Sequence, residues 1–319
     1  MSARSEARKR RRIMRLLRTA LVCLVALAVG LLFCIVPYRS FLPAAQIDAR
    51  EEGEMRVHFL SVGQGDCTIV EFPGGDVLVV DAGDGSFEAN NAIVSYIKGL
   101  DVRSLSLLAT HADIDHYGGF SELLRVFQAD RFYLPVLSSS TSAYQRLLTA
   151  IEGEGCGTQT LTRYDVIGDA SGAYAVCISP HAVDETDANA ASTMLYVSYQ
   201  GINLLLAADA DAAREEHILS ELTLAEDLLD SGAYRVRLDE THFLKVSHHG
   251  SAGASSAQWL SFLSPVAAIV SCGAGNGYHH PAGETMARLA ALGTQIYRTD
   301  ELGNIMLAIR DGRYTLTYA

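Results

Sequence analysis

The sequence lacks several features that would point to particular classes of protein. Its six cysteines include no C-x-x-C pair, so a zinc site built from thiolates is not indicated. No segment is of low complexity, and no repeat with a period of about 20–50 residues is visible, which argues against repeat architectures. The 319 residues, 49% of them hydrophobic, are sufficient for one large globular domain or two small ones.

Basic side chains are scarce beyond the first 18 residues. Residues 1–18 hold eight Lys or Arg against one acid, a net charge of +7. Since the whole chain has a net charge of −12, residues 19–319 carry a net charge of −19. An acidic body with a short basic arm indicates a membrane topology before it indicates nucleic-acid binding. Long contacts with a polyanion are disfavoured, although a local basic groove remains open. The candidates for such a groove are Lys245, Arg288, Arg298 and Arg313.

The basic arm runs directly into an apolar segment, Thr19–Val36, which carries no charge and is followed by Pro37. As a helix at about 1.5 Å per residue it would span roughly 27 Å, near the hydrocarbon thickness of a bilayer. Because positive flanks stay in the cytoplasm, we predict a signal-anchor over 19–37 with the rest of the chain outside the cytoplasm. A cleaved signal peptide is the alternative, and Ala44-Ala45-Gln46 matches a cleavage site only poorly.

Beyond the anchor we expect a short stalk at 38–54 and one domain at 55–319. Its β-rich halves, each with helices, predict an α/β fold with two sheets packed face to face beneath outer helix layers. Strands are predicted at Met55–Leu60, Thr68–Phe72, Val77–Val80, Leu105–Ala109, Arg131–Leu134, Ala173–Ser179, Thr193–Tyr199, Asn203–Ala207, Leu244–Val246, Ala267–Val270, Gln295–Arg298 and Ile305–Ile309. Helices are predicted at Ala89–Lys98, Ser121–Phe127, Tyr144–Glu152, Asp211–Leu222, Ser255–Leu263 and Gly283–Leu292. The cysteines outside the apolar segment are interpreted as buried small hydrophobes, with disulfides as the alternative.

The most informative motif is the loop His111-Ala-Asp-Ile-Asp-His-Tyr-Gly-Gly119, which directly follows the strand predicted at 105–109. Four metal-capable side chains, His111, Asp113, Asp115 and His116, fall within six positions. A strand that ends in such a turn can aim all four into one small volume. Because neighbouring like charges repel, Asp113 and Asp115 need a cation between them unless they lie fully in water. The loop therefore predicts a metal site, against the alternative of a solvated polar loop.

Three later strands also end in polar side chains. Asp209 follows 204–208, the pair His248-His249 follows 244–247, and Asn276, Tyr278 and His280 lie in a glycine-rich loop after 268–272. Each has a simpler explanation when taken alone. Asp209 could be the N-cap of the helix that starts near 211, and the histidine pair could lie in a surface loop. Their recurrence at strand ends favours one shared site.

These motifs resemble the metallo-β-lactamase superfamily, in the variant with Asp at the second ligand position. Beyond the loop at 111–119, the match is to the branch typified by the C-terminal domain of the competence protein ComEC. The matching segments are Phe59–Asp66, Asp81–Gly83, Asn189 with Ser192, Leu206–Asp209, Leu244–Ser251 and Asn276–Pro281. The resemblance runs in order over 55–319 and implies a four-layer αββα sandwich, preceded here by one transmembrane helix, with the metals at one rim.

The resemblance also implies how the site is used. His111 and Asp113 would serve one metal, while Asp115, His116 and either His248 or His249 would serve the other, with Asp209 bridging the two. Mixed imidazole and carboxylate ligands suit Zn²⁺ or Mn²⁺, and the three carboxylates move the balance toward Mn²⁺. Two such ions can hold a bridging hydroxide. The expected catalytic residues are Asp115, Asp209, His280 and Tyr278, the last two as donors to the leaving oxygen or a phosphate; packing is the alternative for Tyr278.

The predicted function is that of a membrane-anchored, extracytoplasmic dinuclear metal-dependent hydrolase. A phosphodiesterase or nuclease, with DNA as one substrate, is set against a hydrolase of a small ester such as a phosphocholine or cell-wall ester. A non-catalytic surface binding module is the third alternative. The lipid bilayer is the expected partner of 19–37. Ser61, Ala208 and His279 depart from the branch's pattern and bear on substrate fit, and the many-pass channel region of the competence protein is absent, so DNA transport is not implied.

Overall fold

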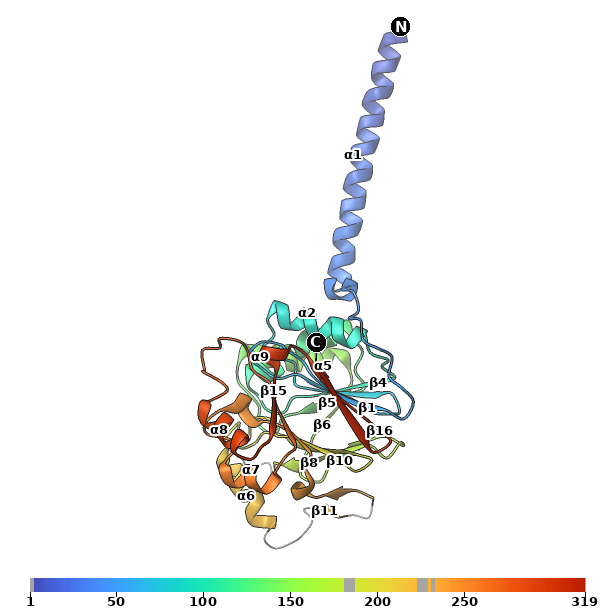
Figure 1. Ribbon diagram of the computed structural model, residues 1–319. Coiled ribbons are helices and arrows are strands. Elements are labelled where there is room, and N and C mark those ends of the chain that lie inside the picture. The colour runs from blue at the N-terminus through green and yellow to red at the C-terminus, as the bar shows by residue number, and fades with distance from the viewer. Residues whose placement is uncertain (1–2, 181–186, 223–228, 231–232, 319) are drawn as a thin grey trace. The chain divides into compact units, whose positions relative to one another are not determined.

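The computed structural model describes residues 3–180, 187–222, 229–230 and 233–318 (Figure 1). The chain forms two compact units, Met1–Pro43 and Ala44–Ala319.

The first unit contains one long helix, α1 (Ala3–Ile35), and the 3-10 turn η1 (Tyr38–Phe41). Within α1, Lys9–Leu31 is long and apolar enough to cross a membrane, as judged by length and composition. The helix begins well before the apolar segment predicted at 19–36, because the arginines and lysine of the basic arm are themselves good helix formers. The arm and the apolar segment are therefore one continuous helix.

The second unit is built on two large sheets. The first has eight strands in the order β17-β16-β1-β2-β3-β4-β5-β6, of which β3 to β6 are parallel neighbours. Their bounds are Met55–Phe59 (β1), Thr68–Glu71 (β2), Asp76–Val80 (β3), Ser104–Leu108 (β4), Arg131–Leu134 (β5), Gly157–Thr160 (β6), Ile305–Arg310 (β16) and Arg313–Tyr318 (β17).

The second sheet has seven strands in the order β15-β14-β13-β10-β9-β8-β7, of which β10, β13, β14 and β15 are parallel. Their bounds are Val166–Gly168 (β7), Tyr174–Ser179 (β8), Met194–Tyr199 (β9), Ile202–Leu206 (β10), Phe243–Lys245 (β13), Ala267–Val270 (β14) and Gln295–Arg298 (β15). A separate small ribbon pairs β11 (Leu229–Asp230) with β12 (Arg235–Val236).

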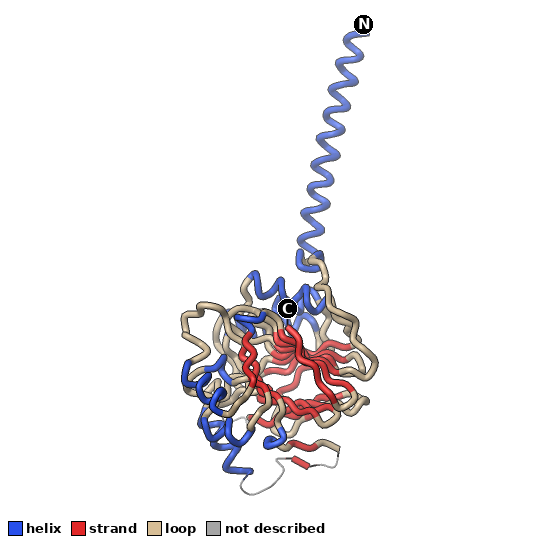
Figure 2. The backbone as a smooth tube through the Cα atoms, in the orientation of Figure 1, coloured by secondary structure: helices blue, strands red, loops and turns tan. Residues whose placement is uncertain are grey.

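Helices lie on both sides of the strands (Figure 2). Side chains of both sheets share one core, which includes Phe59, Leu78, Leu204 and Phe243. The other face of the second sheet packs against helices through Ile218, Trp259 and Leu289. The helices are α2 (Phe87–Lys98), α3 (Ile114–Tyr117), α4 (Phe120–Val126), α5 (Ser142–Glu154), α6 (Ala212–Leu222), α7 (Ala257–Leu263), α8 (Gly283–Ala291) and α9 (Thr299–Leu302), with the turns η2 (Leu238–Glu240) and η3 (Ser247–Gly250). The αββα arrangement predicted from the sequence is confirmed.

Residues 44–54, which we expected to belong to the stalk, lie within the second unit. Their backbone is tied to the domain, since Ala45 N donates to Ser95 O at 2.8 Å and Arg56 Nη1 donates to Asp48 O at 2.7 Å. Strong hydrogen bonds of this kind order a segment that carries little apolar surface of its own. Cys67, Cys177 and Cys272 are buried and free, as interpreted from the sequence, whereas Cys156 is free but only half-buried, so the burial expected for it is wrong.

Candidate metal centre

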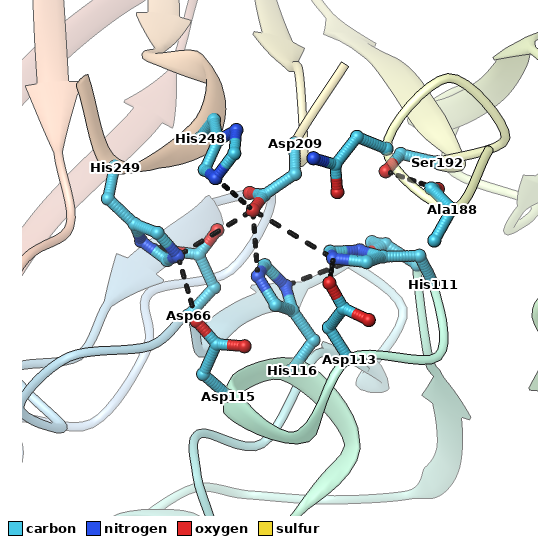
Figure 3. Close-up of polar contacts among 12 residues, drawn as sticks. Asp66, His111, Asp113, Asp115, His116, Ala188, Ser192, Asp209, His248 and His249 are labelled. Atoms are coloured by element: carbon cyan, nitrogen blue, oxygen red, sulfur yellow. Dashed lines mark hydrogen bonds and ion pairs between the residues drawn. The ribbon is translucent and has the colours of Figure 1, made fainter. Parts of the chain in front are cut away.

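The parallel strands of both sheets end at the same site, and the loops that follow them carry its side chains (Figure 3). Asp81 follows β3, and His111 follows β4 in the first sheet, while Asp209 follows β10 and His249 follows β13 in the second. In α/β folds the carboxyl ends of parallel strands form the usual ligand crevice. The fold therefore brings together, at one rim, polar side chains that follow strands more than a hundred residues apart in the sequence.

The loop after β4 is shaped by its glycines. A Cβ on Gly119 would lie 2.2 Å from Ala82 O, and one on Gly118 would lie 2.4 Å from the carbonyl carbon of Asp84. Only glycine permits this close approach, so the loop is pressed against the turn after β3. The short helix α3 starts directly after Asp113, and His116 N donates back to Asp113 O at 3.0 Å. This turn brings His111 and His116 side by side, with ring centroids 4.0 Å apart.

Asp209 is at the centre of the site. Its Oδ2 lies 3.4 Å from His116 Nε2, 3.7 Å from His248 Nε2, and 3.8 Å from both His111 Nε2 and His249 Nε2. The helix N-cap that we considered for this residue is wrong, because Asp211 Oδ1 instead accepts from Arg214 N at 2.9 Å near the start of α6. Asp209 is 3% exposed and free to face the imidazoles.

The two other loop carboxylates lie at the edges of this cluster. Asp115 Oδ2 is 3.4 Å from His249 Nε2, and Asp113 Oδ2 is 3.8 Å from His111 Nε2. The Asp113 side chain is 52% exposed, whereas that of Asp115 is 28% exposed. All four metal-capable residues of the loop thus reach the site, and Asp113 does so from its solvent side.

Four buried atoms of this cluster have no hydrogen-bond partner, namely His111 Nε2, His116 Nε2, His249 Nε2 and Asp209 Oδ1. Buried polar atoms normally have partners, so four orphans that converge require an explanation. A divalent cation would satisfy all of them. Two groups of three ligand atoms, each within 4.8 Å of one another, fit such ions: His111, His116 and Asp209, and Asp115, His116 and His249. The donor set therefore fits two adjacent metal ions.

The electrostatics of the site also favour cations. Burial lowers the pKa of His111 to about 3, which leaves its imidazole neutral and able to bind metal. Burial alone would raise the pKa of Asp209, but His116 and His249 hold it well below its usual range. Burial would likewise lower the pKa of His249, but Asp209 and Asp66 outweigh it and raise that pKa to about 10. The surrounding carboxylates thus attract positive charge to the places where the imidazoles converge.

A second layer of residues orients the imidazoles. His116 Nδ1 lies 2.8 Å from Asp81 Oδ2, and Asp81 also accepts from Thr110 N and Thr110 Oγ1 at 2.8 Å. His249 Nδ1 lies 3.0 Å from Ser271 O. In both rings Nδ1 is held by the protein, and Nε2 is left to face the site. Asp81 was matched only as part of a motif, although its place at a strand end was the same signal that identified Asp209.

The sequence left open which histidine of the 248–249 pair is the ligand. His249 is 1% exposed and approaches both Asp115 and Asp209, whereas His248, with a 31% exposed side chain, approaches Asp209 alone. Both residues have positive φ, 48° and 53°, as does Ala208 at 47°. Such conformations are strained in residues other than glycine and cluster at functional sites. The geometry favours His249 as the inner ligand and places His248 at the rim.

His280 and Tyr278 extend from this rim. The His280 ring stacks on that of His249 at a centroid distance of 6.3 Å, and the Tyr278 ring stacks on that of His280 at 5.9 Å. Tyr278 is 70% exposed, so the packing role that we considered for it is wrong. Asn276 holds the loop, because its Oδ1 accepts from His280 N at 3.0 Å and its Nδ2 donates to Gly273 O at 2.9 Å.

The basic groove considered from the sequence loses one of its candidates. Lys245 is 2% exposed, and its Nζ contacts Asp66 Oδ2, so it cannot line a surface groove. Arg298 is bound to Asp300 and Glu301. Lysine is rarely buried without a partner, and here the buried Asp66 carboxylate supplies one.

A sequence profile described as the metallo-beta-lactamase superfamily matches residues 60–144. The chain has a metallo-β-lactamase fold. It is similar to ComE operon protein 3 of Bacillus subtilis, with 27% identity over 270 residues, covering 80% of this chain and 33% of that protein. It is also similar to competence protein ComA of Neisseria gonorrhoeae, with 27% identity, covering 89% of this chain and 36% of that protein.

The metallo-β-lactamase-fold chain thus spans about a third of the length of these curated relatives. Among solved structures, CmlA, a diiron beta-hydroxylase from Streptomyces venezuelae, aligns with a TM-score of 0.51 and 12% identity, covering 82% of this chain and 55% of that chain. At this identity the likeness concerns the fold alone. The ComEC-type resemblance derived from the motifs is confirmed by the competence proteins, and the fold belongs to a superfamily of mostly metal-dependent hydrolases.

Proposed function

We propose that this protein is a membrane-anchored, extracytoplasmic hydrolase with two divalent metal ions that cleaves phosphodiesters. One observation carries the proposal: three buried imidazole Nε2 atoms and one Asp209 oxygen converge without any hydrogen-bond partner. A non-catalytic module with this fold has no need to keep such a costly arrangement. The same observation is the main argument against a surface module that only binds a partner.

Each proposed ligand has a place in the arrangement. As the family resemblance implies, His111 and Asp113 would hold one ion, and Asp115, His116 and His249 would hold the other. Asp209, 3.4–3.8 Å from the three imidazoles, would contribute to both. Two ions of the Zn²⁺ or Mn²⁺ class, when bound, supply Lewis acidity and a water of lowered pKa for attack on an ester. Asp81 and Ser271 keep the imidazoles in the tautomer that ligation needs, because each engages an Nδ1 atom.

Charge favours an anionic substrate. Two divalent ions give +4, and the carboxylates of Asp113, Asp115 and Asp209 give −3, so the loaded site carries a formal +1. A phosphodiester with its single negative charge complements that field. His280 and Tyr278 lie at the rim, where we place His280 as a contact to the leaving group or to a phosphate oxygen and Tyr278 as a further contact to the substrate. Asp115 and Asp209 hold the reacting centre in position.

The substrate class divides into two candidates. Two similar proteins, competence protein ComA and recombination protein 2 of Haemophilus influenzae, have names that favour nucleic acid. The charge of −19 over residues 19–319 and the burial of Lys245 favour a small anionic ester, such as a phosphocholine ester, since few cations remain to follow a long polyanion. Both candidates contain a phosphodiester linkage, and the charge of the site suits that linkage in either. We therefore propose phosphodiester hydrolysis first and leave the choice between the two substrates to the experiment.

The test uses the purified chain in detergent, loaded separately with Mn²⁺ and Zn²⁺. Single-stranded DNA, double-stranded DNA, bis-p-nitrophenyl phosphate and p-nitrophenylphosphorylcholine form the substrate panel. We expect hydrolysis of bis-p-nitrophenyl phosphate that a chelator abolishes, and the two natural classes are then ranked by kcat/KM. Metal-loaded protein that cleaves none of the four would refute the proposed function.

A further inference from the structure

A buried ion pair lies next to the candidate metal centre. Lys245, the last residue of β13, is 2% exposed, and Asp66, in the loop between β1 and β2, is 3% exposed. The Lys245 Nζ contacts Asp66 Oδ2. Withdrawing two ions from water is unfavourable even when they pair, and apolar residues of similar size usually give equal or greater stability. A pair kept at this place therefore points to a task other than stability.

Asp66 touches both halves of the site. Its side-chain Oδ1 lies 3.3 Å from His249 Nδ1, and its backbone N donates to Asp115 O at 3.1 Å. Asp115 and His249 are the two residues whose Oδ2 and Nε2 approach to 3.4 Å within one candidate metal group. Asp115 follows a strand of the first sheet, and His249 follows a strand of the second. Asp66 thus contacts two proposed ligands that lie on different sheets.

The position of Asp66 is tightly fixed. A Cβ on the preceding Gly65 would lie 2.5 Å from Asp115 O, so this loop approaches the metal loop as closely as only glycine permits. On the other side Asp66 O accepts from Gly83 N at 2.8 Å. The carboxylate is therefore held 3.3 Å from His249 Nδ1, the ring nitrogen that lies 3.0 Å from Ser271 O.

Lys245 decides what this carboxylate can do. Ligand atoms of Asp66, Asp81 and His116 also lie within 4.8 Å of one another, so an unpaired Asp66 could itself take up a cation. The ammonium group occupies Oδ2 and leaves only Oδ1, which faces the His249 ring. The lysine thereby keeps Asp66 as a charged neighbour of the His249 ring, with Oδ1 3.3 Å from Nδ1, rather than as a metal ligand.

We propose that Asp66 and Lys245 are positioning residues, which orient His249 toward the metal ion that it shares with Asp115. This inference rests on the proposed dinuclear site and names residues outside its ligand set. Neither residue touches the metal or the substrate. Their effect is exerted on the metal site that His249 and Asp115 share, because Asp66 contacts these two residues.

The experiment measures Co²⁺ binding to the full chain in detergent, by visible absorption and by competition with a chromophoric chelator. The variants are Asp66→Asn, Lys245→Met, Lys245→Arg and the double change of Asp66→Asn with Lys245→Met. We expect Asp66→Asn and Lys245→Met to weaken one of two Co²⁺ sites roughly 10–100-fold, as loss of a group that orients a ligand does. Lys245→Arg should restore most of the affinity, since it keeps the charge.

The double variant separates positioning from a purely structural role. It leaves no unpaired buried charge, so its Tm should equal or exceed that of the wild type, while its weaker Co²⁺ site stays impaired. Glu71→Gln is the matched control: it disturbs another buried contact, 2.7 Å between Glu71 Oε1 and His58 Nε2, and should lower Tm without changing Co²⁺ affinity.

Three results would overturn the inference: wild-type affinity at both sites in the double variant, equal losses at both sites, or no Co²⁺ binding by the wild type. Failure of the proposed function is recognised separately. If the wild type binds two Co²⁺ ions and one site depends on the pair, but no phosphodiester is cleaved by the loaded protein, the positioning role stands and the phosphodiesterase does not.

Discussion

Among the residues that the structure describes, Asp209 is the one side chain whose carboxylate lies within 4 Å of His111, His116, His248 and His249. We expect Asp209→Ala to lower hydrolysis of bis-p-nitrophenyl phosphate by at least about 10³-fold, because the residue proposed to bridge both metals is lost. Ser61→Asp should keep measurable activity, since the Ser61 backbone N donates to Asn304 Oδ1 at 2.9 Å and the residue lies outside the proposed ligand set. Steady-state rates and metal content of both variants provide the check. A folded Asp209→Ala protein with two metals and near wild-type turnover would rule out bridging.

Tyr278 offers a second test at the scale of one residue. Its ring is stacked and 70% exposed, so we expect the ring face, rather than the hydroxyl, to contact the substrate. Stacking of a base on an aromatic ring contributes about 1–3 kcal/mol, so Tyr278→Ala should lower kcat/KM for single-stranded DNA about tenfold. Tyr278→Phe should be close to the wild type. If Phe is as damaging as Ala, the hydroxyl donor expected from the sequence is the correct role. Tyr318→Ala, an exposed tyrosine on β17, is the control.

At the scale of residues, the sequence was enough to predict the candidate metal ligands, because a polar side chain directly after an apolar strand can be recognised from the sequence alone. It did not identify the partner of Lys245. Asp66 lies 179 positions away, and only the packing of two sheets brings the pair together. The choice between His248 and His249 was equally inaccessible, since adjacent residues in a turn point in directions that only the backbone dihedrals determine.

At the scale of elements, the strands of the two large sheets that sequence analysis missed are all edge strands. These are β6 and β17 in the first sheet and β7 in the second. β17 (Arg313–Tyr318) is largely exposed, and so is β6 (Gly157–Thr160), so neither shows a run of buried apolar residues. The central strands were found because they are buried on both faces and read as continuous apolar segments. Hydrophobic pattern thus predicts the middle of a sheet better than its borders, although the edge strand β15 was found.

One contact between helices gives a prediction of stability. Glu215 in α6 is fully buried, and its two carboxylate oxygens accept from Ser255 N at 2.6 Å and Ser256 N at 2.8 Å, at the start of α7. Glu215→Ala should lower the free energy of unfolding by about 3 kcal/mol, because two buried backbone donors lose a charged partner. Chemical denaturation measures this change. Glu216→Ala, an exposed neighbour, should change it by no more than about 0.5 kcal/mol; equal effects would contradict this account.

At the scale of the whole molecule, metal binding and stability should be coupled. We expect the chain to bind about two divalent ions, as elemental analysis of protein prepared without chelator would show. Because the ligands come from both sheets, the ions bind the folded state only, and their removal should lower Tm. Free metal at about 1,000 times its Kd adds roughly 4 kcal/mol per site. If Mn²⁺ and Zn²⁺ loading leaves no bound metal and Tm unchanged, the hydrolase interpretation fails as a whole.

The last prediction concerns which side of the membrane carries the second unit. Residues 1–18 hold eight cations, and α1 contains Lys9–Leu31, which is long and apolar enough to cross a bilayer. Since positively charged flanks remain cytoplasmic, Ala44–Ala319 should lie outside the cytoplasm. Protease added to intact cells should then remove the domain, while a cytoplasmic marker protein stays intact.

Replacing Arg8, Lys9 and Arg10–Arg12 with Ser should weaken this orientation and protect part of the domain. Complete protection of the wild-type domain would place it on the cytoplasmic side, and release of the uncut domain into the medium would indicate a cleaved signal.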